Sequence, residues 1–163
     1  MKKLSLDVID IRILSAVQKY GQLSKTKLAQ IVNLSATPCW FRLNKLKESG
    51  FIMAYRADIA IGRIGELSQV VVTVSLSHHG KSDIERFEAH ICKTDGITEC
   101  ISTCGGIDYI LKVITVNLTE FHQLIESLLS ADIGIDRYMI YIVTREIKSE
   151  PPNLVQLFKP NKK

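Results

Sequence analysis

The sequence lacks any uninterrupted apolar run of about 18 residues, the length that a membrane-spanning helix needs. The lysines near its start are followed by no apolar stretch and no small-residue cleavage site, so a secretory signal is not expected. Its four cysteines (Cys39, Cys92, Cys100 and Cys104) form no CxxC pair and are expected to be reduced and mostly buried. These absences predict a cytoplasmic protein with no membrane partner.

Catalytic and metal-binding motifs are also missing. The sequence contains no GxSxG, no Walker loop, no HExxH and no GxGxxG after a strand. Cys100 and Cys104 would share one face of a predicted strand, but no third and fourth zinc ligand lies nearby in the sequence. We therefore expect no catalytic residue, no metal and no cofactor.

Charge is distributed unevenly along the 163 residues, whose formal net charge is +4. Residues 1–63 contain eleven Lys and Arg against four Asp and Glu, a net charge of +7. The remaining 100 residues contain ten against thirteen, a net charge of −3. A basic part joined to a mildly acidic one indicates that only the first part meets a polyanion.

The first fifty residues have the apolar periodicity of three short helices. Asp7, Ser24 and Ser35 are the predicted N-caps of these helices. The third helix has one apolar face, formed by Cys39, Leu43 and Leu46. Residues 51–56 then predict a short strand. Three short helices with a tight turn before the last one favour a winged helix-turn-helix.

The second part alternates between strand and helix patterns. Strands are predicted at 70–76, 97–104, 109–116 and 139–147, and two helices are predicted to begin at the caps Ser82 and Asn117. The order β-α-β-β-α-β is that of a ferredoxin-like domain, so the fold class is α+β. We expect a helix-turn-helix domain at 1–56, a linker at 57–66, the ferredoxin-like domain at 67–150 and a C-terminal tail at 151–163, frayed and solvated at its basic end 159–163.

The predicted strands are apolar on nearly every residue, as in Val70-Val71-Val72. Two helices can cover only one face of a four-stranded sheet, so the other face needs a second cover, and another subunit can supply it. This pattern predicts a homodimer built through the second domain.

In a helix-turn-helix the second helix of the pair enters the major groove of double-stranded DNA, here the helix from Ser35 to Glu48. Arg and Asn side chains can pair with base edges, and lysines, here with Lys27 and Lys47 included, suit phosphates. The predicted DNA contacts are Ser24, Lys25, Ser35, Thr37, Trp40, Phe41, Arg42, Asn44 and Lys45. Two alternatives remain open: a regulatory subunit whose helical head docks on protein instead of DNA, and a small enzyme that uses the ferredoxin-like domain.

Several separate positions resemble the Lrp/AsnC (feast/famine) family of regulators, in register over nearly the whole chain. The stretch from Leu6 to Leu14 has the family's opening Leu-Asp-x-x-Asp-x-x-Ile-Leu. Leu23-Ser24, Leu28-Ala29, Leu34-Ser35, Arg42-Leu43, Leu46, Gly50-Phe51-Ile52 and Tyr55 follow at the family's spacing. The stretch Thr37-Pro38-Cys39-Trp40 is similar to the leucine-responsive branch in particular.

This resemblance implies a DNA-binding transcriptional regulator that forms dimers and often octamers and responds to an amino acid or a related small metabolite. Gly105, Asp108 and Tyr109 match the family's Gly-x-x-Asp-Tyr turn, which implies an effector site there, between dimers. Gly106 departs from the family, because many relatives carry an acidic residue at that position. From the residues alone, the stretch from Gly105 to Asp108 is explained as a simple turn, because Gly and Asp are favoured in turns for backbone reasons.

Overall fold

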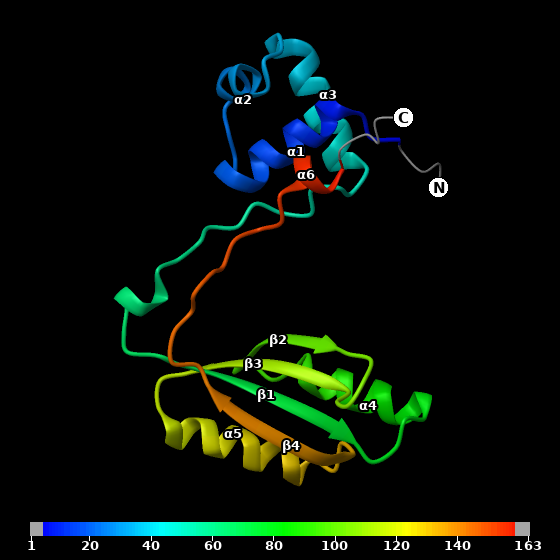
Figure 1. Ribbon diagram of the computed structural model, residues 1–163, viewed down its shortest axis with the longest axis vertical. Helices are drawn as coiled ribbons and strands as arrows, with labels where there is room; N and C mark the ends of the chain where they lie inside the picture. Colours follow the sequence, from blue (N-terminus) through cyan, green and yellow to red (C-terminus); the bar gives the residue numbers. More distant parts are fainter. Residues whose placement is uncertain (1–4, 159–163) are drawn as a thin grey trace. The chain divides into compact units, whose positions relative to one another are not determined.

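Figure 1 shows the computed structural model, in which residues 5–158 are described. The chain divides into two compact units. The first contains residues up to Ile59 together with the segment that begins at Lys148, and the second contains Ala60–Ile147. The chain therefore leaves the first unit, builds the second and returns. None of the helices in residues 5–158 is both long enough and apolar enough to span a membrane.

The first unit contains the three predicted helices, α1 (Val8–Tyr20), α2 (Lys25–Val32) and α3 (Ala36–Glu48). All three predicted N-cap residues directly precede their helices. Asp7 accepts a hydrogen bond from the N–H of Asp10 (2.8 Å), and the carboxylate of Asp10 accepts one from the N–H of Asp7 (3.1 Å). Ser24 accepts from the N–H of Lys27 (3.2 Å), whereas the side chain of Ser35 makes no capping bond.

The predicted strand at 51–56 is not formed. Residues 51–60 have no regular secondary structure and belong to no sheet. A strand requires a partner for its backbone hydrogen bonds, and within the described residues none lies alongside this segment. The apolar residues of the segment pack on the helices instead, because Ile52 and Tyr55 contact the core that α1, α2 and α3 share.

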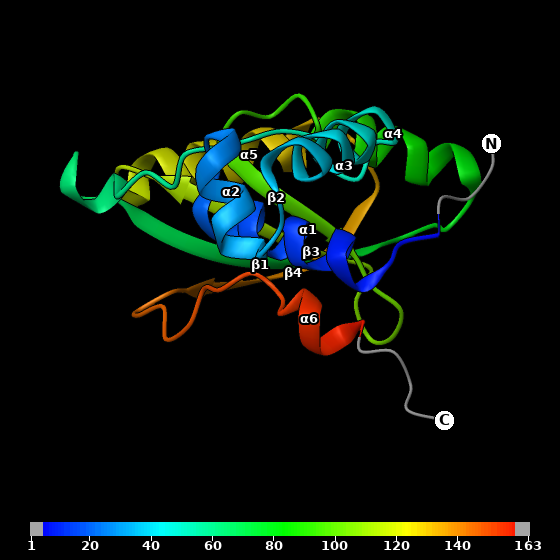
Figure 2. The same ribbon diagram turned by 90° about the horizontal axis from the view of Figure 1, so that it is seen from above.

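A short helix, α6 (Leu154–Leu157), packs on α1 (Figure 2). Its N-cap is Asn153, whose side chain accepts a hydrogen bond from the N–H of Gln156 (3.1 Å). Residues 151–158, which the sequence assigned to a C-terminal tail, therefore belong to the first unit. The predicted fraying of 159–163 lies outside the described residues.

The second unit is a four-stranded antiparallel sheet with two helices. Its elements are β1 (Ser68–Leu76), α4 (Lys81–Ile91), β2 (Ile97–Ser102), β3 (Tyr109–Thr115), α5 (Leu118–Ser130) and β4 (Ile135–Ile142). The strand order β2-β3-β1-β4 is the ferredoxin-like one, which confirms the predicted fold class. A 3₁₀ turn at Ile61–Arg63 lies within the predicted linker.

Several boundaries differ from the predictions, those of β4 by the most residues. Strand β4 begins at Ile135 instead of Met139 and ends at Ile142, because its register with β1 runs only from Leu76 to Val70. Helix α4 begins one residue before Ser82, since the carbonyl of Gly80 accepts the first helical N–H bonds and Ser82 is not its cap. Asn117 does cap α5, accepting from the N–H of Glu120 (2.8 Å).

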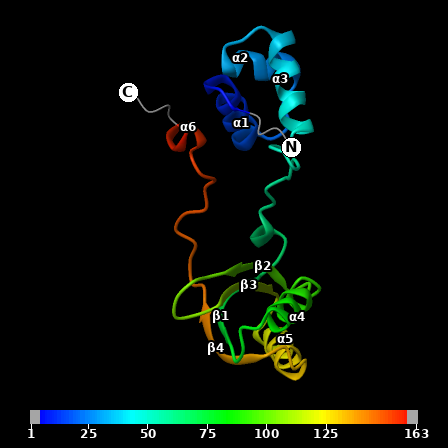
Figure 3. The same ribbon diagram turned by 90° about the vertical axis from the view of Figure 1, so that its right-hand side faces the viewer.

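Both helices cover the same face of the sheet (Figure 3). Between them and the sheet lies a core in which Val70, Leu111 and Phe87 are fully buried. The opposite face, here named the open face, carries large apolar side chains that no described residue covers: Ile101, Met139 and Tyr141. This is the two-faced sheet that the apolar strands predicted.

Candidate DNA interface and effector site

Helix α3 has one buried and one exposed side. The predicted inner residues Cys39, Leu43 and Leu46 are each at most 2% exposed, as predicted. Thr37, Phe41 and Lys45 are exposed and recur every four residues, so they share the opposite face of the helix. Phe41 is 70% exposed, which is unusual for a large apolar side chain. Asn44 is half-buried beside this exposed row.

Arg42, one of the predicted DNA contacts, is bonded to other residues of the same unit. Its guanidinium Nη1 donates to Asp7 Oδ2 (2.6 Å) and to Asp10 Oδ1 (2.8 Å), so it bonds both carboxylates at the start of α1. The N–H of Asp10, and then Arg42 itself, lower the pKa of the Asp7 carboxyl. In turn, the hydrogen bonds to Asp10 and Asp7 raise the pKa of Arg42. Arg42 thus fastens α3 to the capped end of α1 and is not directed away from the unit.

Lys47 is also engaged within the unit. Its Nζ lies 5.6 Å from the centre of the Trp40 ring and 5.2 Å from the centre of the Tyr55 ring. A cation at this distance from a ring face is attracted by the ring quadrupole. Trp40 and Lys47 therefore help to hold the segment after α3, which is the packing against the wing that the sequence left open for Trp40 as an alternative to a DNA contact.

The remaining predicted DNA contacts are exposed. Ser24 and Lys25 lie at the start of α2, and Ser35 precedes α3. Within residues 5–158, neither Lys25 nor Lys45 forms an ion pair. Both ammonium groups are therefore available to phosphates.

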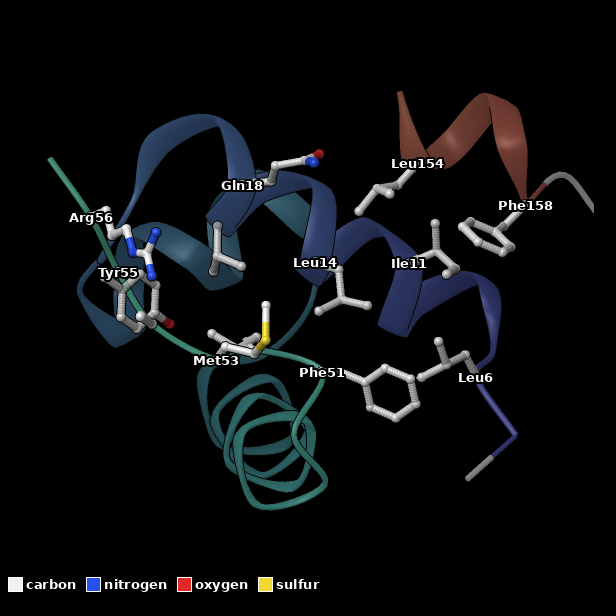
Figure 4. Close-up of a pocket in the computed structure, with 13 residues that line it drawn as sticks. Leu6, Ile11, Leu14, Gln18, Phe51, Met53, Tyr55, Arg56, Leu154 and Phe158 are labelled. Carbon is white, nitrogen blue, oxygen red and sulfur yellow. The ribbon is translucent and has the colours of Figure 1, made fainter. Parts of the chain in front are cut away.

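Behind α3, an apolar groove of about 660 Å³ runs between α1, residues 51–56 and α6. Figure 4 shows Leu154 and Phe158 of the C-terminal segment beside Ile11 at one end of the groove. Leu14 and Met53 line its middle. Leu154 and Phe158 thus cover part of the outer face of α1.

The predicted effector turn joins β2 to β3. Gly105 has a φ of +146°, a region that residues with a side chain rarely adopt, so glycine is required there. Asp108 Oδ2 accepts a hydrogen bond from the N–H of Leu76 (2.7 Å), and Oδ1 lies 2.9 Å from His79 Nε2. The bond from Leu76, followed by that from His79, lowers the pKa of Asp108.

Tyr109 is not at the surface of this turn. It is 3% exposed, its hydroxyl donates to Glu88 Oε1 (2.9 Å) and its ring lies 4.5 Å from that of Phe87. Burial, followed by the bond to Glu88, raises the pKa of Tyr109 to about 12. Asp108 lies in the turn before β3, whereas Tyr109 is the first residue of that strand and is buried, so their side chains are separated although they are neighbours in sequence.

The structure brings His79 to the turn, where the sequence did not predict it. His79 and Asp108 are 29 positions apart and meet only because the end of β1 lies beside the β2–β3 turn. Cys39 is buried as expected, but Cys92, Cys100 and Cys104 are exposed, contrary to the prediction. In the described part of the chain, no group of three or more His, Cys, Asp or Glu side chains is placed to hold a metal ion.

Comparison with known proteins identifies both units. Residues 69–153 match the Lrp/AsnC ligand binding domain, over more than half of the chain, and residues 6–53 match a winged helix-turn-helix DNA-binding domain. The chain belongs to the Lrp/AsnC family. It is a transcriptional regulator that joins a DNA-binding helix-turn-helix to a ligand-binding domain, as the sequence predicted.

Several Lrp/AsnC relatives match over nearly their whole length. The transcriptional regulatory protein DoeX of Halomonas elongata is 36% identical over 145 residues, which cover 89% of this chain and 92% of that protein. The leucine-responsive regulatory protein of Haemophilus influenzae is 35% identical over 145 residues, with 88% and 87% covered. The structure of a transcriptional regulator of Neisseria meningitidis in complex with L-methionine gives a TM-score of 0.82 at 28% identity, over 90% of this chain and 94% of that chain.

Proposed function

We propose that this regulator binds double-stranded DNA as a homodimer, with α3 of each subunit in a major groove. The observation that carries this proposal is the exposed row Thr37–Phe41–Lys45, which lies directly opposite the buried face of the same helix. Asn44 and Thr37 are suited to base edges, and Lys25 and Lys45 to phosphates. Ser24, Ser35, Trp40 and Phe41 complete the proposed interface, from which we now leave out Arg42.

The open face of the sheet supports the homodimer. Met139 is 54% exposed and Tyr141 48%, and Ile101 extends the same apolar surface across β2. An apolar surface of this kind is stabilised when a second copy covers it. We expect a particle of at least twice the 18.3 kDa of the chain, with octamers as the higher assembly.

We further propose that an amino acid or a related metabolite binds at the turn that contains Gly105, Gly106 and Asp108. The matched domain is described as ligand-binding, relatives are named leucine-responsive, and the Neisseria relative was crystallised with L-methionine. Effector binding would favour one assembly over another, and it can do so only through different affinities for the two. Since its target is DNA, we propose a cytoplasmic location.

A salt titration of DNA affinity tests the interface. Each phosphate contact contributes about −0.9 to the slope of log affinity against log salt. Lys45→Gln removes two contacts from a dimer and should make the slope less steep by about two. Lys93→Gln, which replaces an exposed lysine of the second unit, is the control and should leave the slope unchanged. A flat slope for the unmodified protein would instead support a head that docks on protein.

A further inference from the structure

Phe41 is the most exposed large apolar side chain of α3. It lies in the first half of the helix and is 70% exposed, against 37% for its neighbour Trp40. Both adjacent side chains have partners within the unit: the ring of Trp40 faces the ammonium group of Lys47, and Arg42 bonds the two carboxylates at the start of α1. Within residues 5–158, Phe41 belongs to no apolar cluster and pairs with no aromatic ring or cation. The packing of the unit therefore does not account for Phe41.

The side chains on either side of Phe41 in the exposed row are polar. Thr37 and Lys45 lie one turn before it and one turn after it, about 6 Å away along the helix axis. The core of a protein interface usually joins several apolar side chains, whereas this row sets one apolar ring between a hydroxyl group and an ammonium group. The major groove of DNA has a matching composition, because its floor is polar, its walls are phosphates and its apolar group is the C5-methyl group of thymine.

The chemistry of the phenyl ring limits which base it can face. The ring of Phe41 has no hydrogen-bond donor or acceptor, so it cannot bond the base edges as Asn44 or Thr37 can. A purine edge, or the amino group of cytosine, would lose its water under the ring and gain no partner. The methyl group of thymine is itself apolar, and phenylalanine is one of the side chains that contact it in the major groove.

We propose that Phe41 recognises the C5-methyl group of thymine and so determines which base the centre of α3 accepts. This inference rests on the proposed DNA interface and adds the base and the side chain that reads it. The two copies of Phe41 in a homodimer contact two symmetry-related thymines, one in each half-site. Phe41 is thus a specificity-determining residue, whereas Lys25 and Lys45 supply affinity for any sequence.

The test begins with the duplex that the full chain selects from a library with a randomised central segment. Each symmetry-related pair of thymines in that duplex is then replaced by deoxyuridine, which lacks only the methyl group and pairs with adenine in the same way. Affinities are compared at one low salt concentration, which keeps weakly binding variants measurable. The variants are Phe41→Ala and Phe41→Leu. Tyr20→Ala is the matched control, because Tyr20 is a 52% exposed ring of α1 outside the proposed interface.

One pair of thymines should be sensitive to the loss of its methyl groups. Burial of one methyl group contributes about fourfold to affinity, so the unmodified protein should bind the deoxyuridine duplex about fifteenfold more weakly. Phe41→Ala should bind the thymine and deoxyuridine duplexes equally, within twofold. Phe41→Leu keeps an apolar side chain and should retain part of the sensitivity, and Tyr20→Ala should retain all of it. Because Phe41 is exposed, the urea midpoint and the particle mass of Phe41→Ala should equal those of the unmodified protein.

Several results would overturn the inference. If Phe41→Ala keeps the full sensitivity to the methyl groups, another side chain reads them, although the proposed DNA interface stands. The same conclusion follows if no thymine of the selected duplex is sensitive, or if the library yields no preferred duplex while the salt slope is steep. If Phe41→Ala changes the particle mass, a second copy of the chain covers the ring instead of DNA. If the unmodified protein binds no duplex at all, this inference and the proposed DNA interface fail together.

Discussion

Arg42→Ala should destabilise the DNA-binding unit by about 2 kcal/mol. Arg42 Nη1 bonds Asp10, whose side chain is only 12% exposed, and a hydrogen bond to a charged group contributes about 1.5–3 kcal/mol. The second partner, Asp7, is 49% exposed, so solvent screening limits that pair to less than about 1 kcal/mol. Removing the guanidinium leaves the Asp10 carboxylate shielded from water without its cation.

Urea unfolding followed by tryptophan fluorescence measures this loss directly. The chain has one tryptophan, Trp40, and it lies on α3, so the signal reports the unit that contains Arg42. With a denaturant slope of about 2 kcal/mol per molar, the urea midpoint should fall by about 1 M. Protein concentration is kept constant, because subunit association also changes apparent stability.

Lys45→Ala is the control, since Lys45 lies on the same helix, is exposed and forms no ion pair in residues 5–158. Its free energy of unfolding should change by less than about 0.5 kcal/mol. The double variant with Asp10→Asn should lose less than the sum of the two single variants, because both remove one contact. If Arg42→Ala keeps its midpoint and loses only DNA affinity, the side chain reads DNA and the proposed structural role is wrong.

Three further results are expected. Leu154→Ala should lower the same unfolding free energy by about 1 kcal/mol, because it removes apolar cover from α1, whereas Gln156→Ala, which replaces an exposed residue of α6, should not. The pKa of Asp108 is lower in the folded than in the unfolded protein, so its contribution to stability is present above the unfolded pKa. That contribution is lost as the pH falls through the folded pKa. The free energy of unfolding of Asp108→Asn should therefore depend less steeply on pH below about pH 4. Met139→Asp on the open face should shift the protein to the monomer in light scattering, and an unchanged dimer mass would assign the interface elsewhere.

The features that the sequence predicted well are those determined by nearby residues. The Asp7 and Ser24 caps bond residues three positions away, and the β-branched run at 70–76 predicts a strand without knowledge of its partners. The segment at 51–56 has the composition of a strand, but a strand also needs a neighbour, and composition does not supply one.

Contacts between distant residues were not predictable in this way. Arg42 and Asp10 are 32 positions apart, and a basic residue on a polar helix face has the same appearance in the sequence whether it binds DNA or a carboxylate. Tyr109 follows Asp108 directly, yet its aromatic ring enters the core, because the turn ends between the two and the strand begins. The position of His79 required the pairing of β1 with β3, which no local pattern specifies.

The return of the chain to α1 makes the DNA-binding unit discontinuous in sequence. During synthesis the ribosome releases α1, α2 and α3 first, but Leu154 and Phe158 emerge only after the whole ferredoxin-like domain. The outer face of α1 therefore stays uncovered until Leu154 and Phe158 are made, and the nascent helices reach their final packing only after that. A fragment cut after residue 59 to isolate the DNA-binding part would lack Leu154 and Phe158, so the outer face of its α1 would stay uncovered.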